Sequence, residues 1–346
     1  MREAAASARQ KERSMNAKYD ILGIGNAIVD VLVKSDEAFL LRENIQKGAM
    51  TLIDEARAQT LSSLTGHGTV MSGGSGANTV VGAASLGART AFFGKVKNDE
   101  PGRHFADDIK KIGVHFPTSP SMVGAATARC FVFVTPDGER TMNTYLGACQ
   151  NLTAADLDEQ TIEASAITYL EGYLWDPPAA KDAFKKASAV ARRAGRKVAL
   201  TLSDSFCVDR YRSEFLELIR SRAVDIVFAN QHELKSLYTT ESFDTAKEAL
   251  RQEGVLGVVT CSEQGSVVVT QAGFENVPAF PVSRVVDTTG AGDLFAAGFL
   301  AGLAKNKDHV TCARLGALAA SEIIQHIGAR PQVSLRELAG KHGIAI

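Results

Sequence analysis

The segment VDTTGAGD at residues 286–293 places two glycines between an extended run and a long apolar run. Residues 280–286 have the pattern of a strand and residues 294–303 that of a buried helix, so the sequence predicts strand, glycine turn and helix. Glycine allows the tight bend and leaves room for a ligand. The N–H groups of Gly290, Ala291 and Gly292 would lie at the helix N-terminus, where unpaired N–H groups and the helix dipole bind anions.

Asp293 falls in the first turn of this predicted helix. The helix dipole favours a carboxylate there, so a structural role is one interpretation. The other is catalytic, because a carboxylate beside an anion site can take a proton from a hydroxyl that attacks a phosphoryl group. Position alone leaves both interpretations open.

Two upstream stretches repeat the combination of glycine and polar side chains. Residues 73–79, GGSGANT, form a glycine turn that runs into a helix of small residues. Asn26 and Asp30 lie in an otherwise apolar strand. Buried Asn and Asp need hydrogen-bond partners, which the hydroxyls of a polyol would provide. The alternative for Asp30 is that it caps the next segment.

The G-x-G at residues 23–25 does not indicate a dinucleotide-binding turn. Ile28 occupies the position of the third glycine, and residues 29–33 continue as a strand instead of a helix. A Rossmann-type turn needs strand, glycine turn and helix together, so we exclude it. A Walker G-x-x-x-x-G-K-[ST] sequence is also absent.

The second half of the chain alternates strand-like and helix-like segments. This pattern predicts a parallel sheet whose ligands bind beyond the carboxyl ends of the strands. The predicted strands are 166–170, 197–202, 226–229 and 257–260. After the third of them, Asn230 and Glu233 have the spacing of a helix capping box, although the same pair could also face a ligand.

Residues 128–134 and 140–145 flank the turn sequence PDGE and predict a β-hairpin. Phe131 and Phe133 share one face of the first strand. They could stack on a flat ligand or pack within the hairpin's own core. Arg140 could reach a transferred phosphate or remain a solvated charge.

The overall composition is that of a globular protein with few constraints on partners. The chain has 346 residues, a formal net charge of −1 and no run of about 18 apolar residues, which argues against nucleic-acid and membrane partners. Five scattered cysteines without a C-x-x-C pair favour reduced thiols in the cytoplasm. Residues 1–15 are small and polar, and we expect a disordered extension there before a single domain at 16–346.

The segment DTTGAGD at 287–293 resembles the signature of the ribokinase (PfkB-type carbohydrate and nucleoside kinase) family. The G-G-x-x-x-N pattern ending at Asn78 and the N-x-x-E pattern ending at Glu233 are similar to further motifs of that family. The resemblance covers about residues 19–340. It implies a three-layer α/β/α fold with a mostly parallel central sheet and a small β-rich lid, here built from about 31–54 and 124–148.

The resemblance also implies roles for individual residues. Asp293 would be the catalytic base and the 290–292 amides the anion hole. The remaining implied contacts are with a sugar (Asn26, Asp30, Gly74, Ser75, Asn78), with ATP (Asn230, Thr260, Ser262, Gly265, Thr288, Gly290, Gly292, Ala317, Ser321) and with the water around Mg²⁺ (Glu233). Ser262 departs from the family pattern T-x-G, which leaves the local backbone path open.

Within the family, the long insertion between Asp30 and Gly73 is more similar to adenosine kinases than to ribokinases. Met50 and Leu52 in that insertion would suit a flat base, as would Phe131 and Phe133 if they face the ligand. We therefore expect phosphorylation of a nucleoside 5′-hydroxyl, with adenosine as the first candidate. The alternatives are a sugar kinase for ribose, fructose or a sugar acid, and an inactive relative that binds nucleosides. The protein would act as a monomer or a homodimer.

Overall fold

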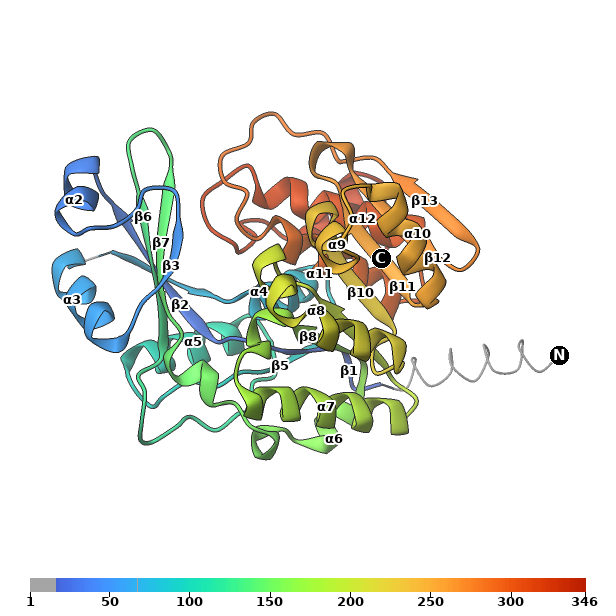
Figure 1. The fold of residues 1–346 in the computed structure, drawn as a ribbon, viewed down its shortest axis with the longest axis horizontal. Coiled ribbons are helices and arrows are strands. Elements are labelled where there is room, and N and C mark those ends of the chain that lie inside the picture. Colours follow the sequence, from blue (N-terminus) through green and yellow to red (C-terminus); the bar gives the residue numbers. More distant parts are fainter. Residues whose placement is uncertain (1–16, 67) are drawn as a thin grey trace.

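The computed structural model describes residues 17–66 and 68–346, and the extension expected at 1–15 lies outside these residues. The described chain forms a large sheet and a small sheet (Figure 1). Six neighbouring strands of the large sheet run parallel to one another. At one edge follow two more strands, each antiparallel to the strand before it. In spatial order the strands are β13 (Gly273–Val277), β12 (Ser266–Thr270), β11 (Leu256–Thr260), β10 (Ile226–Asn230), β9 (Lys197–Thr201), β8 (Ser165–Glu171), β1 (Tyr19–Ile24) and β5 (Thr90–Phe93).

Helices cover both faces of the large sheet, because its strands are apolar on both sides. In β1, Ile21 packs into one hydrophobic cluster and Leu22 into the other. On the first face lie α4 (Ser75–Ser85), α5 (Glu100–Lys111), α11 (Ala291–Ala304), α12 (His309–Ile323) and α13 (Leu335–Lys341). On the second lie α6 (Glu159–Glu163), α7 (Pro178–Arg193), α8 (Ser205–Arg220), α9 (Gln231–Leu237) and α10 (Phe243–Glu253). The expected three-layer α/β/α fold with a mostly parallel sheet is confirmed.

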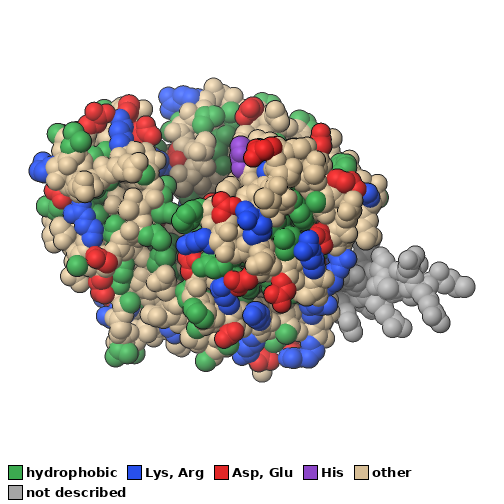
Figure 2. Space-filling model, viewed as in Figure 1, with side chains coloured by type: hydrophobic (Ala, Val, Ile, Leu, Met, Phe, Trp, Pro, Cys, Tyr) green, Lys and Arg blue, Asp and Glu red, His purple; other side chains and the backbone are tan. Residues whose placement is uncertain are grey.

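The small sheet contains the predicted hairpin, whose strands match the predicted bounds. Its strand order is β3 (Met50–Leu52), β7 (Arg140–Tyr145), β6 (Ala128–Val134), β2 (Ile28–Lys34) and β4 (Thr69–Gly73). Strand β4 lies outside the two segments that we expected to build this layer. Two helices, α2 (Glu37–Arg42) and α3 (Glu55–Thr65), pack on the face that carries Phe131 and Phe133. The opposite face is turned toward the large sheet, and the surface is hollowed between the two parts (Figure 2).

The strand predicted at residues 280–286 is not formed. Beyond β13 the chain runs without regular structure as far as the glycine turn. This run pairs with no strand of either sheet. Instead, the N–H groups of Val286 and Asp287 donate to the carbonyl of Ile324 just after α12, at 2.7 and 3.3 Å. The turn is therefore anchored by a helix end.

No helix within residues 17–66 and 68–346 is both long enough and apolar enough to cross a bilayer.

Candidate active site

The glycine turn leads directly into α11. Gly290 is the N-cap with a φ of 79°, a left-handed conformation that strongly favours glycine. A Cβ atom there would lie 2.8 Å from the Cβ of Ala329, whereas a Cβ on Gly292 would meet nothing within 4 Å. The turn is thus tight on its inner side and open in front. The N–H of Ala291 donates to the carbonyl of Thr288 at 3.2 Å. Among the described residues, the N–H groups of Gly290 and Gly292 have no such partner and remain for an anion.

Asp293 is held by two side chains from the start of α4. Ser75 Oγ donates to its Oδ1 at 2.6 Å, and Asn78 Nδ2 donates to its Oδ2 at 3.0 Å. Asp293 as a whole residue is half-buried. Burial raises its pKa, while the two hydrogen bonds and the charge of Arg330 act in the opposite direction. The predicted turns at 73–79 and 287–293 therefore meet, and they present a carboxylate with an increased affinity for a proton.

Gly74 explains how α4 comes so close. Its φ is 93°, and a Cβ atom there would lie 2.1 Å from the carbonyl oxygen of Asn26. Only glycine fits between the end of β1 and the first turn of α4. Gly74 thus positions Ser75 and Asn78, whatever contact it makes with a ligand.

Asp30 lies on β2 of the small sheet, with Met71 and Cys130 as its neighbours across the strands. Among the described residues its carboxylate has no hydrogen-bond partner. Burial raises its pKa to about 6, and the charges of Arg140 and Arg330 counteract this rise. A half-buried carboxylate without a protein hydrogen-bond partner is available to accept hydrogen bonds from hydroxyl groups.

Asn26 is placed differently from our expectation of a free ligand contact. Its backbone N–H and its side-chain amide donate to the carboxylate of Glu171 at 3.1 and 2.6 Å. The N–H of Gly76 donates to the same carboxylate at 2.7 Å. Glu171 is buried at the end of β8, and burial raises its pKa to about 7. It ties the end of β1 to the start of α4.

Sequence reasoning missed Glu171 and Arg330. Glu171 is an acidic residue that ends a strongly apolar strand, which is the signal that identified Asp30. The same signal applied at residue 171 would have found it. Arg330 lies in an irregular segment after α12 and carries no comparable signal in the sequence.

Arg140 takes neither of the two expected positions. Its guanidinium forms an ion pair with Asp287, the first residue of the DTTGAGD segment. The Asp287 carboxylate also accepts hydrogen bonds from the N–H groups of Thr289 and Gly328, each at 3.0 Å. The pair joins the hairpin of the small sheet to the glycine turn.

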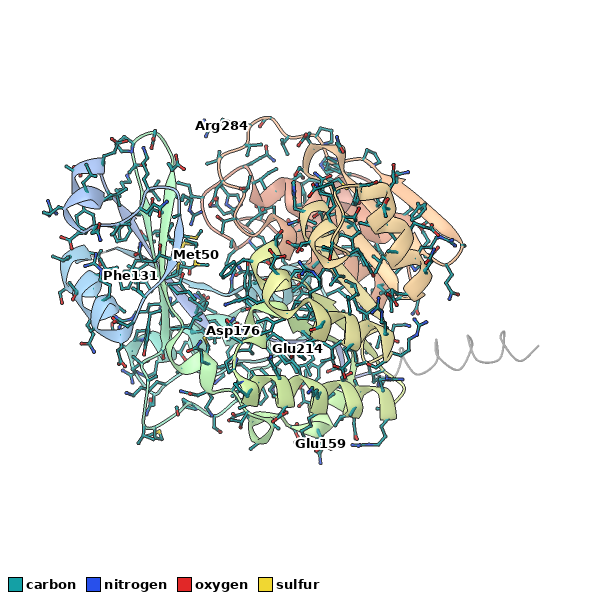
Figure 3. All side chains as sticks on the ribbon, in the orientation of Figure 1. Met50, Phe131, Glu159, Asp176, Glu214 and Arg284 are labelled. Carbon is teal, nitrogen blue, oxygen red and sulfur yellow. The ribbon has the colours of Figure 1, made fainter. Side chains whose placement is uncertain are left out.

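On the small sheet, the two pairs of apolar candidates lie on opposite faces. Met50 and Leu52 are 48% and 50% exposed, and Figure 3 shows Met50 on the side toward the large domain. Phe131 and Phe133 are fully buried in the cluster beneath α2 and α3. The expectation that these rings could stack on a ligand is therefore corrected: they pack in the interior of the small domain, because the two helices need an apolar surface to cover.

The residues expected at the nucleotide come from four parts of the chain. Asn230 and Glu233 form a full capping box at the start of α9, with Glu233 buried and its pKa raised to about 7 by burial. Ala317 and Ser321 are buried in α12, where Ser321 Oγ donates to the carbonyl of Leu318 at 2.7 Å. The others, Thr260, Ser262, Gly265 and Thr288, lie in or beside the connections after β11 and before α11.

Ser262 adopts the left-handed conformation that a glycine would take at this point of the family pattern, with a φ of 51°. Such a conformation costs a non-glycine residue about 1–2 kcal/mol. We expect Ser262→Gly to raise the free energy of unfolding by roughly 0.5–1 kcal/mol, after the greater freedom of glycine in the unfolded chain is counted. Urea unfolding would measure the change. Ser266→Gly in β12, where glycine relieves no strain, is the control and should destabilise; a loss of stability in Ser262→Gly as well would contradict the argument.

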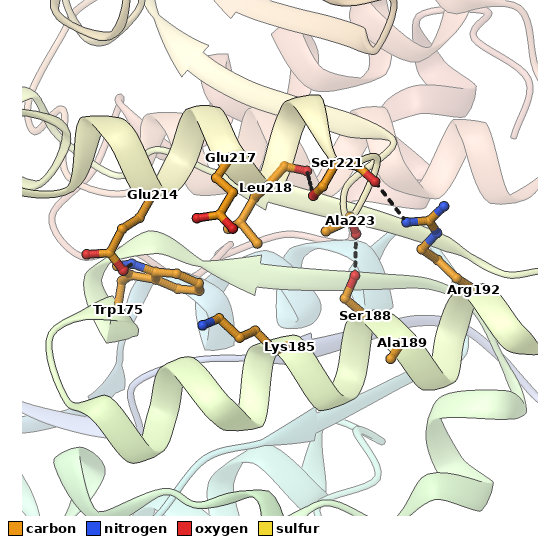
Figure 4. A pocket seen from close by; sticks show the side chains of 10 residues that line it. All are labelled: Trp175, Lys185, Ser188, Ala189, Arg192, Glu214, Glu217, Leu218, Ser221 and Ala223. Atoms are coloured by element: carbon orange, nitrogen blue, oxygen red, sulfur yellow. Dashed lines mark hydrogen bonds between the residues drawn. The ribbon is translucent and has the colours of Figure 1, made fainter.

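A hollow of about 240 Å³ lies elsewhere, between α7 and α8 (Figure 4). Its lining includes Trp175, Lys185, Arg192 and Glu217. None of its lining residues belongs to the site around Asp293.

Within the described residues there is also no cluster of three or more His, Cys, Asp or Glu side chains that could hold a metal ion directly.

Comparison with known proteins gives relatives that are kinases. The chain is similar to the crystal structure of adenosine kinase from Sinorhizobium meliloti, with 54% identity, a TM-score of 0.88 and coverage of 94% of this chain and 100% of that one. It is also similar to a probable sugar kinase protein from Rhizobium etli, with 47% identity, a TM-score of 0.89 and coverage of 95% and 100%. Adenosine kinase from Saccharomyces cerevisiae is 27% identical over 310 residues, which are 86% of this chain and 88% of the yeast protein.

Fold, site and relatives together define a phosphotransferase that acts on an alcohol group. The model of the pfkB family of carbohydrate kinases matches residues 48–335, and the chain belongs to that family.

Proposed function

We propose that the protein is an ATP- and Mg²⁺-dependent kinase that phosphorylates the 5′-hydroxyl of a nucleoside, with adenosine as substrate. The observation that carries the proposal is the placement of Asp293. Its carboxylate is held by Ser75 and Asn78 beside the open N–H groups of Gly290 and Gly292. A base for the hydroxyl and donors for the phosphoryl charge are thus next to each other.

In the proposed reaction, Asp293 accepts the proton of the 5′-hydroxyl as its oxygen attacks the terminal phosphoryl group of ATP. The new bond joins the 5′-oxygen to phosphorus, and the bond between that phosphorus and the bridging oxygen of ADP breaks. The N–H groups of Gly290 and Gly292 stabilise the charge on the phosphoryl oxygens. Asp30 accepts hydrogen bonds from the ribose hydroxyls, and Glu171 holds the loops at Asn26 and Gly76 that border them.

The two apolar side chains of β3, Met50 and Leu52, are exposed and supply the apolar surface for a flat base. The small sheet acts as a lid that keeps water from the phosphoryl group, since water would compete as an acceptor. In this proposal Arg140 leaves Asp287 when substrates are bound and turns toward the phosphoryl oxygens.

The nucleotide would lie along the ends of β10 and β11 and against α12. In this proposal Mg²⁺ binds the chain through water, and the described residues contain no group of three or more His, Cys, Asp or Glu side chains that would hold it by themselves. That is a common way for Mg²⁺ to bind, with one or two carboxylates and the phosphates of the nucleotide. We assign Glu233 as the carboxylate that orders this water, and the ion would neutralise charge on the phosphates.

A sugar kinase is the second candidate. It is favoured by the 47% identity to a probable sugar kinase and by the burial of Phe131 and Phe133, which removes two rings that could have stacked on a base. An inactive nucleoside-binding relative is opposed by the carboxylate of Asp293 and its two donors.

An ATP-consumption screen with adenosine, inosine, guanosine, ribose and fructose tests the proposal. We expect turnover of adenosine. Turnover of ribose or fructose alone would favour the sugar kinase, and turnover of none of the five together with measurable nucleoside binding would favour the inactive relative.

We further propose that the enzyme is a cytoplasmic monomer. All five cysteines are free in the structure, and α2 and α3 cover one face of the small sheet through which a second copy could pair.

A further inference from the structure

Arg330 is an arginine beside the candidate site that uses only one of its three side-chain nitrogens. Its Nε donates to Oδ1 of Asn78 at 2.9 Å. Both terminal nitrogens are buried and have no hydrogen-bond partner among the described residues. Within residues 17–66 and 68–346, no carboxylate lies within ion-pair distance of its guanidinium. A residue whose role was only to hold the segment after α12 against α4 would be expected to use these donors.

The single hydrogen bond has a definite consequence for Asn78. A guanidinium can only donate, so the side-chain oxygen of Asn78 must face Arg330. The amide nitrogen then faces the opposite way, toward Asp293, to which it donates at 3.0 Å. Arg330 therefore fixes which end of the amide meets the carboxylate of Asp293.

We propose that Arg330 is a positioning residue for Asp293 that acts through the amide of Asn78. The inference rests on the proposed function, because it assigns Asp293 the role of base. It adds a residue that controls Asp293 without contacting it, beside Ser75 and Asn78, which do contact it.

The charge of Arg330 acts in the same direction as its hydrogen bond. The groups around Asp293 are Ser75 and Asn78 on α4, Asp30 on β2, Tyr169 and Glu171 on β8, Tyr173 just after β8, and Arg330. Arg330 is the cation in this set, and it favours the ionised carboxylate that a base needs. The carboxylates of Asp30 and Glu171 and the burial of the site favour the protonated form.

Two substitutions separate the hydrogen bond from the charge. Arg330→Met removes both and keeps an unbranched side chain of moderate size. We expect kcat at pH 7 to fall about 10- to 100-fold, the KM for the acceptor to stay within about threefold, and the acidic limb of kcat/KM against pH to move up by about one unit. Arg330→Lys keeps the charge but loses the planar guanidinium. For this variant we expect a roughly tenfold lower kcat with the acidic limb unmoved.

Asn78→Ala and the double variant Asn78→Ala/Arg330→Met complete the test. Because the hydrogen bond of Arg330 acts through Asn78, the losses in kcat on the pH plateau should not add, and there the double variant should be little worse than Asn78→Ala. The upward move of the acidic limb, which comes from the charge of Arg330, should persist in the double variant. Arg336→Met, at an exposed arginine on α13, is the matched control and should change neither kcat nor the pH profile.

A purely structural Arg330 would give a different pattern. Arg330→Met would then lower the melting temperature and reduce activity equally at every pH, with the acidic limb in place, and this result would overturn the proposal. If Arg330→Met does not fold, Arg330→Lys carries the test, and full activity in that variant would overturn the proposal as well.

Failure of the proposed function gives a separate signal. If the wild-type protein phosphorylates a sugar instead of adenosine, the same variants are measured with that sugar. If it phosphorylates none of the acceptors, carboxyl ¹³C NMR of Asp-labelled protein still compares the pKa of Asp293 in wild type and Arg330→Met, with Asp293→Asn to assign the signal. An unchanged pKa in Arg330→Met would then reject the inference independently of turnover.

Discussion

We expect the Asp293→Asn variant to lose phosphotransfer by about a thousandfold or more while it keeps its affinity for the acceptor within a few-fold. Asn has nearly the shape of Asp, and its carbonyl oxygen can still accept a hydrogen bond from Ser75 or Asn78. What the variant lacks is the capacity to accept the proton of the attacking hydroxyl. The loss should therefore appear in kcat, measured by ATP consumption, and calorimetric titration should show binding of nearly wild-type strength.

Two controls make this result specific to Asp293. Asp244→Asn replaces a carboxylate that is 91% exposed at the start of α10, and it should leave kcat unchanged. Ser75→Ala removes one donor to Asp293 and keeps the base, so it should lower kcat by about tenfold at most. Retention of more than about a tenth of the wild-type kcat in Asp293→Asn would reject Asp293 as the base.

The part of the site that could be predicted from sequence is the part formed by short continuous segments. The turns at 73–79 and 287–293 carry their glycines and polar side chains within a few residues, so their local form follows from sequence. The expectation that both turns contribute to one site came from their positions after predicted strands, which puts them at one edge of the sheet, and from the family resemblance. The structure agrees with it to the extent that Ser75 and Asn78 both contact Asp293.

What could not be predicted depends on partners that are distant in the chain. Glu171 binds Asn26 across 145 residues, and Arg330 binds Asn78 across 252 residues. No local spacing signals such a contact. The extended run at 280–286 failed as a strand for a related reason, because a strand needs a partner strand elsewhere in the chain, and this run pairs with none and bonds instead to the carbonyl of Ile324 after α12.

Phe131 and Phe133 show a third limit. The period-two pattern of a strand shows that both rings share a face, but it does not say which face of the sheet meets the ligand. In the structure, α2 and α3 cover the face that carries the rings, and their buried Leu40 and Leu61 belong to the same cluster as Phe131 and Phe133. The opposite face of the sheet carries Asp30 and Cys130.

Among substitutions that act on stability, we expect Asp287→Ala to have the largest effect. The Asp287 side chain is only 3% exposed, and it accepts hydrogen bonds from Arg140, Thr289 and Gly328. Its removal leaves the guanidinium of Arg140, 14% exposed, and two backbone N–H groups without their acceptor. Loss of one partner from a buried ion pair costs about 3–5 kcal/mol. For a chain of this size that corresponds to a fall of roughly 4–7 °C in melting temperature, measured by calorimetry.

Arg140→Ala should cost less, about 1–2 kcal/mol, because the two backbone N–H groups still stabilise the Asp287 carboxylate. The double variant Arg140→Ala/Asp287→Ala should be more stable than the sum of the single losses predicts, since it removes the unpaired charge that each single variant leaves behind. Asp244→Ala breaks the exposed pair with Lys247 and should change stability by less than about 0.5 kcal/mol. Losses that add within error would show that the small sheet and the glycine turn are not coupled through this pair. A coupling of about 1 kcal/mol or more would mean that any movement of Arg140 toward a phosphoryl group first has to break a stabilising contact, so that substrate binding must supply the free energy for it.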